Sequence, residues 1–337
     1  KEKKDVKIYN ATEDAIALAD ALARNPADCD VLVDILPALS RDQMFDLRSE
    51  YEGYCKTEEH DGNLAECIKL RVGGVFGEIC YATVLGQYES EGYWVERACS
   101  SNLMALSMLG GALFGRPNIE IQEIKDKFRS VKYRSSLTQL VEDRLEVDQA
   151  RRIALVALAA ERQGESDTRP DEYRDSDVDE LHRAIDGRYD SQLLWRIMLR
   201  SDAQLREVLK EYTRKYRINL PLKILWMSYD PALVIISYIL IGVMNRPARD
   251  AQSLYDALMA LTKSELKESR MSLENDEEWK FQLLASILVR AHWDRRHLKN
   301  VKIEYEEKYQ STVELDLVNA TTGYFREFCL GLVRTET

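Results

Sequence analysis

Apolar residues recur three and four positions apart along most of the chain, and no sustained alternation of apolar and polar residues replaces that pattern. The three-and-four spacing places apolar side chains on one face of an α-helix, whereas alternation is typical of a half-buried strand. Short polar or glycine-containing stretches separate the periodic segments. The sequence therefore predicts an all-α protein built from many short helices.

One framework occurs four times within this helical pattern. Each copy is marked by an aromatic residue near the end of a helical segment: Tyr51, Phe128, Tyr212 and Tyr305. In three copies a good N-capping residue lies eleven positions earlier: Ser40, Ser201 and Asp294. Asn118 is the expected cap in the looser second copy. A supersecondary unit that recurs in this way determines the fold before any single motif does.

The four copies have predicted boundaries at 7–90, 91–165, 178–246 and 247–333. Between the second and third copies, 166–177 is rich in acidic and turn-forming residues and is predicted to be a linker. The fourth copy carries a polar insertion at 262–278. Because the linker divides the chain near its middle, we expect copies one and two to form one half of the molecule and copies three and four the other.

Charge and composition narrow the function. The net charge of −11 disfavours binding to nucleic acid. The six cysteines contain no CxxC pair, which favours reduced thiols and a cytoplasmic location. The longest apolar run, 232–244, is shorter than the ~20 residues of a membrane-spanning helix. The four histidines are scattered and no catalytic triad is present in the pattern, so no enzymatic activity is predicted.

The framework resembles the repeat of the annexin family. The matching segments are 288–290, 298–305 and 321–332 in copy four, 197–202 and 205–212 in copy three, and 47–51 and 72–76 in copy one. The resemblance implies a curved disc of four repeats, each with about five helices. It also implies binding to acidic phospholipid through calcium ions. In this family, backbone carbonyls of a glycine-rich loop after the first helix and a carboxylate just before the fifth helix hold the ion.

The calcium carboxylate implied by this resemblance is missing from every copy. The positions where it is expected hold Arg71, Arg144, Met227 and Ala320. The glycine-rich loop is also replaced, for example by 24–27 in copy one. Calcium requires oxygen ligands and an acid that neutralises its charge, and neither arginine nor alanine supplies them. We therefore predict that the usual calcium sites are largely lost.

Two acidic groups remain as weak calcium candidates. The first combines the loop residues Gly187, Tyr189 and Asp190 with Asp230 near the following turn. The second is the cluster Glu274, Asp276, Glu277 and Glu278. A solvated acidic loop is the alternative interpretation of both groups. No cofactor is predicted apart from weakly bound calcium.

The resulting functional hypothesis is a cytoplasmic protein that associates peripherally with acidic phospholipid membranes and depends weakly or not at all on calcium. Arg71 and Arg144 would then contact lipid phosphate directly, since guanidinium groups pair well with phosphate. The alternative is a non-enzymatic scaffold that binds cytoskeletal or trafficking proteins and has lost lipid binding. The loss of all four carboxylates favours this alternative more than the family resemblance does.

Overall fold

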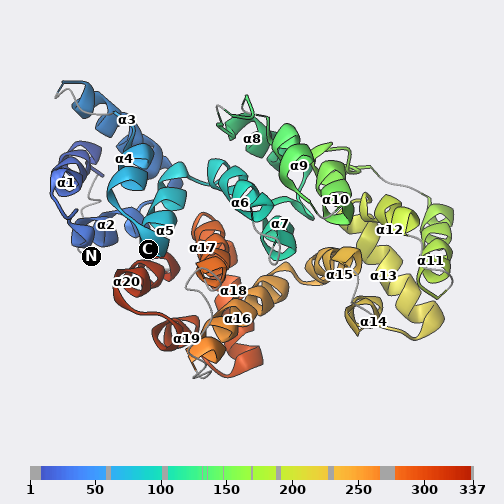
Figure 1. Ribbon diagram of the computed structural model, residues 1–337. Coiled ribbons are helices and arrows are strands. Elements are labelled where there is room, and N and C mark those ends of the chain that lie inside the picture. The colour runs from blue at the N-terminus through green and yellow to red at the C-terminus, as the bar shows by residue number, and fades with distance from the viewer. Residues whose placement is uncertain are drawn as a thin grey trace, which may run out of the picture. The chain divides into compact units, whose positions relative to one another are not determined.

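The computed structural model describes residues 9–57, 62–100, 105–130, 132–134, 136–146, 148–167, 170–186, 191–226, 231–265 and 278–334. Within these residues the chain forms twenty α-helices and one short 3-10 helix, and it contains no strand. Figure 1 shows this helical architecture along the chain. The all-α fold class predicted from the sequence is confirmed. In the described part of the chain, no helix combines the length and the apolar character needed to cross a membrane.

The helices fall into four successive groups of five, called copies one to four. Copy one contains α1 (Ala11–Ala23), α2 (Cys29–Ile35) with η1 (Leu36–Ala38), α3 (Arg41–Thr57), α4 (Leu64–Arg71) and α5 (Gly74–Leu85). Copy two contains α6 (Glu89–Cys99), α7 (Ala105–Leu113), α8 (Asn118–Lys127), α9 (Leu137–Arg144) and α10 (Asp148–Leu158). Copy three contains α11 (Asp171–Asp186), α12 (Ser191–Met198), α13 (Asp202–Tyr216), α14 (Leu220–Trp226) and α15 (Pro231–Met244). Copy four contains α16 (Arg246–Glu265), α17 (Glu278–His292), α18 (Arg295–Tyr309), α19 (Val313–Ala320) and α20 (Gly323–Val333).

The repeated aromatic residue is a core position in every copy. Its side chain is at most 3% exposed in each case: Tyr51, Phe128, Tyr212 and Tyr305. The predicted caps are present in three copies. The Ser40 hydroxyl accepts from the amide of Gln43, and the Asp294 carboxylate accepts from the amide of His297 at 2.9 Å. Ser201 caps α13 in the same way.

The cap predicted for the second copy is wrong. Pro117 precedes α8, and Asn118 is already the first helical residue. The side chain of Asn118 instead exchanges two hydrogen bonds with the backbone of Arg162, accepting from its amide at 3.0 Å and donating to its carbonyl at 2.7 Å. This asparagine therefore stabilises the exit from α10, because it satisfies backbone groups that follow the helix end.

The chain divides into two compact units, and the predicted pairing of copies is wrong. Unit 1 contains residues 1–90 and 254–337, so it combines copy one with most of copy four. Unit 2 contains residues 91–253 and combines copies two and three.

Apolar packing between distant segments explains the composition of unit 1. The rings of Phe76 on α5 and Phe328 on α20 lie 6.0 Å apart in an edge-to-face arrangement. A Cβ atom added to Gly331 would lie 2.7 Å from a side-chain atom of Pro37, so α20 and η1 pack at close range. Aromatic pairs and close backbone approach of this kind stabilise the contact, and it joins residues from the two ends of the chain.

The predicted linker is shorter than expected, because α11 begins at Asp171 within it. Two acidic residues open this helix, where they interact favourably with its N-terminal dipole. Val178 and Leu181 are fully buried on its inner face. Asp177 is also buried, and its carboxylate accepts two hydrogen bonds from the guanidinium of Arg200, at 2.9 and 3.0 Å. The acidic residues of the predicted linker therefore belong in part to a helix, and the inner face of that helix is packed.

Candidate functional site

The turn before the fifth helix of copy one is the best-defined part of the candidate site. Its approach helix, α4, begins at a side-chain cap, because the side chain of Asn63 accepts from the amide of Glu66 at 3.2 Å. The helix ends at Arg71. The turn continues to Gly74, whose φ of +65° lies in the left-handed region that favours glycine. This geometry delivers the side chain of Arg71 to the end of α1.

The guanidinium of Arg71 binds three successive backbone carbonyls. Its Nε donates to the carbonyl of Leu22 at 2.9 Å. Its Nη2 donates to the carbonyls of Ala23 at 3.1 Å and Arg24 at 2.9 Å. These three carbonyls terminate α1 and would otherwise lack partners within the helix. They converge on one cation, which is the side chain of this arginine.

The electrostatics of this contact favour a positive charge. The carboxyl end of a helix carries a partial negative charge, so α1 attracts the guanidinium. Carbonyl oxygens are also ligands that calcium accepts, but calcium requires six to eight oxygens and is commonly held by a bidentate carboxylate. Arg71 itself lies at the position where the family resemblance implies that carboxylate. The side chain of Arg24 points elsewhere and pairs with Asp28 at 2.5 Å. The three carbonyl oxygens are therefore already bound by a cation that belongs to the protein, the guanidinium of Arg71.

Copy two repeats this substitution. Arg144 is the last residue of α9, as Arg71 is of α4. Burial raises the pKa of the Cys99 thiol to about 12, and the positive charge of Arg144 acts in the opposite direction. This electrostatic interaction indicates that Arg144 lies near the end of α6, the first helix of copy two. Hydrogen bonds fix Arg71 at the end of the first helix of copy one, whereas in copy two the link between Arg144 and the end of α6 is electrostatic.

Copy four keeps the turn but changes its chemistry. Gly323 has a φ of +61°, close to that of the copy-one glycine. Ala320 is buried and brings neither a charge nor an oxygen-bearing side chain. The Thr321 hydroxyl donates to the carbonyl of Leu317 at 2.5 Å, and the Thr321 carbonyl accepts from Nε of Arg326 at 2.6 Å. The hydroxyl and the carbonyl of the buried Thr321 are thus both satisfied by neighbouring residues of copy four.

Most of the weak calcium candidates lie outside the described residues: Gly187, Tyr189, Asp190, Asp230, Glu274, Asp276 and Glu277. The lost-carboxylate position Met227 lies outside them as well. Glu278 is described, and it is the first residue of α17, where a negative charge complements the helix dipole. Among the residues that the structure describes, no group of three or more histidine, cysteine, aspartate or glutamate side chains is arranged to hold a metal ion.

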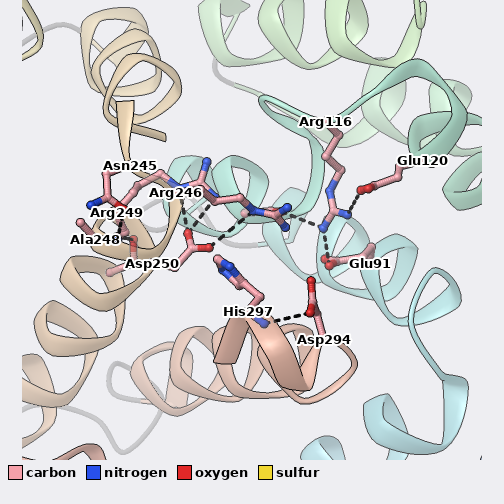
Figure 2. Close-up of polar contacts among 12 residues, drawn as sticks. Glu91, Arg116, Glu120, Asn245, Arg246, Ala248, Arg249, Asp250, Asp294 and His297 are labelled. Carbon is pink, nitrogen blue, oxygen red and sulfur yellow. Dashed lines mark hydrogen bonds and ion pairs between the residues drawn. The ribbon is translucent and has the colours of Figure 1, made fainter. Parts of the chain in front are cut away.

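A separate cluster of charges lies in unit 2. Figure 2 shows Arg116 between Glu91 on α6 and Glu120 on α8, with distances of 2.5 and 2.7 Å. The Arg116 side chain is 9% exposed and that of Glu91 2%. Arg116 also donates to the carbonyl of Gly111 at 3.0 Å. Because Arg116 and Glu91 are buried and Arg116 bridges α6 and α8 through its two ion pairs, we interpret the cluster as a structural link between helices of copy two.

Sequence reasoning missed the acceptors of Arg71. It placed the loop of copy one at 24–27, whereas the carbonyls that converge on the cation belong to Leu22, Ala23 and Arg24. The available signal was an arginine at a position where the family resemblance implies an acid. The sequence does not identify backbone acceptors, because every residue carries a carbonyl.

Comparison with known proteins shows which proteins this chain resembles in sequence and in fold. No family model matches the sequence. A curated relative, Annexin C1 of Cryptococcus neoformans, is 24% identical over 331 residues, which cover 96% of this chain and 65% of the relative. The chain therefore spans about two thirds of the length of that protein.

Solved structures share the fold along almost the entire chain. Annexin III is 19% identical with a TM-score of 0.77, and the match covers 99% of this chain and 95% of that one. A variant of annexin A8 is 18% identical with a TM-score of 0.79, covering 98% and 96%. Calcium-bound annexin (Sm)1 is 16% identical with a TM-score of 0.69, covering 96% and 90%.

The chain thus belongs to the class of all-α proteins with four five-helix repeats, the annexin fold. Its similarity to Annexin C1 along 96% of its length supports membership of the annexin family. Arg71 and Arg144, the last residues of α4 and α9, lie at two of the positions where the resemblance implies a calcium carboxylate.

Proposed function

We propose that this protein binds acidic phospholipid membranes peripherally, without enzymatic activity and without the usual dependence on calcium. Family membership supports the membrane surface as the partner, and one structural neighbour is a calcium-bound annexin. The proposal departs from that neighbour in the origin of the positive charge. In this chain, arginine side chains supply the charge that a calcium ion would otherwise bring to the turns.

The three hydrogen bonds of Arg71 carry this proposal. They hold a fixed cation against the carbonyls of Leu22, Ala23 and Arg24. A calcium ion competing for these oxygens would have to displace the guanidinium and would still lack a carboxylate from this position. Nε and Nη2 serve the carbonyls, and we assign Nη1 to the contact with lipid phosphate.

Local charge is essential to this proposal because the whole chain is acidic. The net charge of −11 repels an anionic membrane at long range. Attraction must therefore come from cationic positions such as Arg71 and Arg144 within a short distance of the headgroups. Salt shortens the range of that attraction to about 10 Å at 0.1 M and to about 3 Å at 1 M. Calcium-independent binding should accordingly weaken strongly as salt rises.

Sedimentation with phosphatidylserine vesicles tests the proposal. The chain should pellet with vesicles in the presence of a calcium chelator, and addition of millimolar calcium should change the bound fraction little. High salt should release it. Pelleting only with calcium would contradict calcium independence and direct attention to the acidic groups at 187–190 and 274–278. Absence of pelleting under both conditions would favour a scaffold that binds cytoskeletal or trafficking proteins.

A further inference from the structure

Two large apolar side chains protrude at equivalent places in copies one and three. Leu70 is 72% exposed at the end of α4, and Trp226 is 87% exposed at the end of α14. Each directly precedes a position where the family resemblance implies a calcium carboxylate, namely Arg71 and Met227. Exposure of a large apolar side chain has no stabilising effect in the free protein, since burial is what contributes free energy.

Basic residues accompany both protruding side chains. Leu70 lies between Arg71 and Lys69, and because Lys69 pairs with Glu66 at 3.9 Å, these three charges leave a net positive charge at the end of α4. Lys223 lies three positions before Trp226 on α14, so the two residues share one side of that helix. Leu222 on the same helix is 50% exposed. The ends of α4 and α14 therefore combine apolar and cationic character, which complements an anionic lipid surface.

Two equally exposed apolar residues on third helices provide a contrast. Phe45 on α3 is 75% exposed, and Ile119 on α8 is 73% exposed. Phe45 is followed by Asp46 and shares a shallow hollow with Glu50. Ile119 is followed by Glu120. Acidic neighbours disfavour the approach of anionic lipid, so exposure alone does not distinguish a membrane contact from an ordinary surface residue.

The isolated position of the exposed Leu70 and Trp226 side chains favours a lipid bilayer over a protein as the binding partner. A stable protein interface buries roughly 800 Å² on each partner and needs a continuous complementary surface. Leu70 and Trp226 are single side chains at the ends of helices of eight and seven residues. A bilayer interface accepts isolated side chains without a complementary shape, and tryptophan is enriched at the headgroup level because its ring is amphipathic.

We propose that Leu70 and Trp226 are apolar membrane anchors, each of which inserts between lipid headgroups while the neighbouring cations contact phosphate. This inference rests on the proposed function and specifies how the membrane is held without calcium. Burial of the two side chains in lipid supplies binding free energy, and the basic residues confine that burial to anionic membranes.

The test uses vesicles of phosphatidylserine mixed with brominated phosphatidylcholine in the presence of a calcium chelator. Bromine on the acyl carbons nearest the headgroups quenches the fluorescence of a tryptophan inserted at the headgroup level, and Trp226 is the exposed one among the five tryptophans. We expect quenching in the wild type. Trp226→Ala should weaken vesicle binding about tenfold, and Leu70→Ala should weaken it severalfold. Trp226→Phe should retain most of the affinity but lose the quenching.

Matched controls separate anchoring from general loss of apolar surface. Phe45→Ala in unit 1 and Ile119→Ala in unit 2 should leave vesicle binding unchanged, with thermal unfolding confirming that every variant is folded. Wild-type binding that is unaffected by both Trp226→Ala and Leu70→Ala, without bromine quenching, would overturn the anchors and leave the proposed function standing. Failure of the folded wild type to bind these vesicles would overturn the proposed function and the anchors together.

Discussion

The turns that precede α5 and α20 have nearly the same backbone and different chemistry. Gly74 and Gly323 have φ values of +65° and +61°, and a Cβ atom added at either position would meet no neighbouring atom within 4 Å. Three residues before each glycine, copy one has Arg71 and copy four has Ala320. The arginine extends to the end of α1, whereas the alanine is buried in its own repeat. The two turns therefore share a glycine of positive φ, although the side chain three residues earlier is different.

This comparison separates two requirements. The glycine satisfies the fold, because the left-handed conformation costs other residues about 1–2 kcal/mol. The residue three positions earlier determines whether a positively charged side chain of the protein binds the carbonyls at the end of the first helix. In copy one that cation is the protein's own guanidinium, whereas in copy four Arg326 donates to the carbonyl of Thr321 within the turn. The two copies therefore share the glycine turn and differ in the side chain that lies three residues before it.

The largest expected effect follows from reversing the charge at the copy-one turn. Arg71→Glu removes the internal cation and adds a carboxylate beside the carbonyls of Leu22, Ala23 and Arg24. We expect the variant to gain a calcium site with a dissociation constant on the order of 10⁻⁴–10⁻³ M. Isothermal titration calorimetry of the wild type and the variant measures the difference.

Arg71→Gln is the matched control for this charge reversal. It removes the cation without adding a charged oxygen ligand, so it should bind calcium more weakly than Arg71→Glu. A folded Arg71→Glu variant that shows no more calcium binding than the wild type would contradict the view that these carbonyls form a cation site.

The second prediction concerns the contact between copies one and four. His292 is buried in unit 1, with Nε2 3.1 Å from the carbonyl oxygen of Leu39 and Nδ1 3.3 Å from that of Leu332. Burial lowers the pKa of His292 to about 4, and the charge of Arg295 acts in the same direction. Because the pKa is lower in the folded protein than the usual 6.5, the unfolded chain binds the proton more readily. Stability from this group is complete above pH 6.5 and is lost as pH falls through 4.

The expected loss is about 3 kcal/mol between pH 6.5 and pH 4. Urea unfolding at a series of pH values measures it, with His292→Gln as the comparison because glutamine is not titratable. The difference in unfolding free energy between wild type and variant should therefore change with pH in this window. A difference that is constant from pH 6.5 to pH 4 would show that His292 does not couple protonation to the packing of these two copies.

The third prediction tests whether the two turns are equivalent in the fold. Gly74→Ala and Gly323→Ala each place a side chain at positive φ in open space, so backbone strain is the expected cost. Each substitution should destabilise the protein by about 1–2 kcal/mol. Chemical denaturation of both variants measures the two costs side by side. Costs that differ by more than about 1 kcal/mol would show that the turns are not equivalent.

The smallest expected effect comes from deleting the two arginines that serve these turns. Arg71→Ala should destabilise copy one by about 1 kcal/mol, since it leaves three carbonyls to be hydrated by water. Arg326→Ala removes the hydrogen bond from Nε to the carbonyl of Thr321 and should cost less. Thermal unfolding ranks the two variants. A larger loss of stability for Arg326→Ala than for Arg71→Ala would contradict the prediction that the Arg71 hydrogen bonds contribute more.

Local sequence patterns were sufficient for the repeat and its internal geometry. Tyr51 and Tyr305 are buried in equivalent helices, and Ser40 and Asp294 cap those helices as predicted. These features depend on residues close together in the chain. Periodicity and capping chemistry therefore reveal them directly.

The pairing of copies and the acceptors of Arg71 depend on distant segments. The ring contact between Phe76 and Phe328 joins residues from the first and last repeats, and no local pattern encodes it. Similarly, the sequence locates a cation at residue 71 but does not identify Leu22 as its partner across another helix. Several acidic candidates, including Asp190 and Asp230, lie outside the described residues and stay predictions.

A crystal structure of the wild-type protein grown in millimolar calcium tests the central claim most directly. The account predicts density for the Arg71 guanidinium against the carbonyls of Leu22, Ala23 and Arg24, with no calcium ion at that turn. A calcium ion bound to these carbonyls, with Arg71 turned away, would contradict the claim that the protein supplies its own cation there.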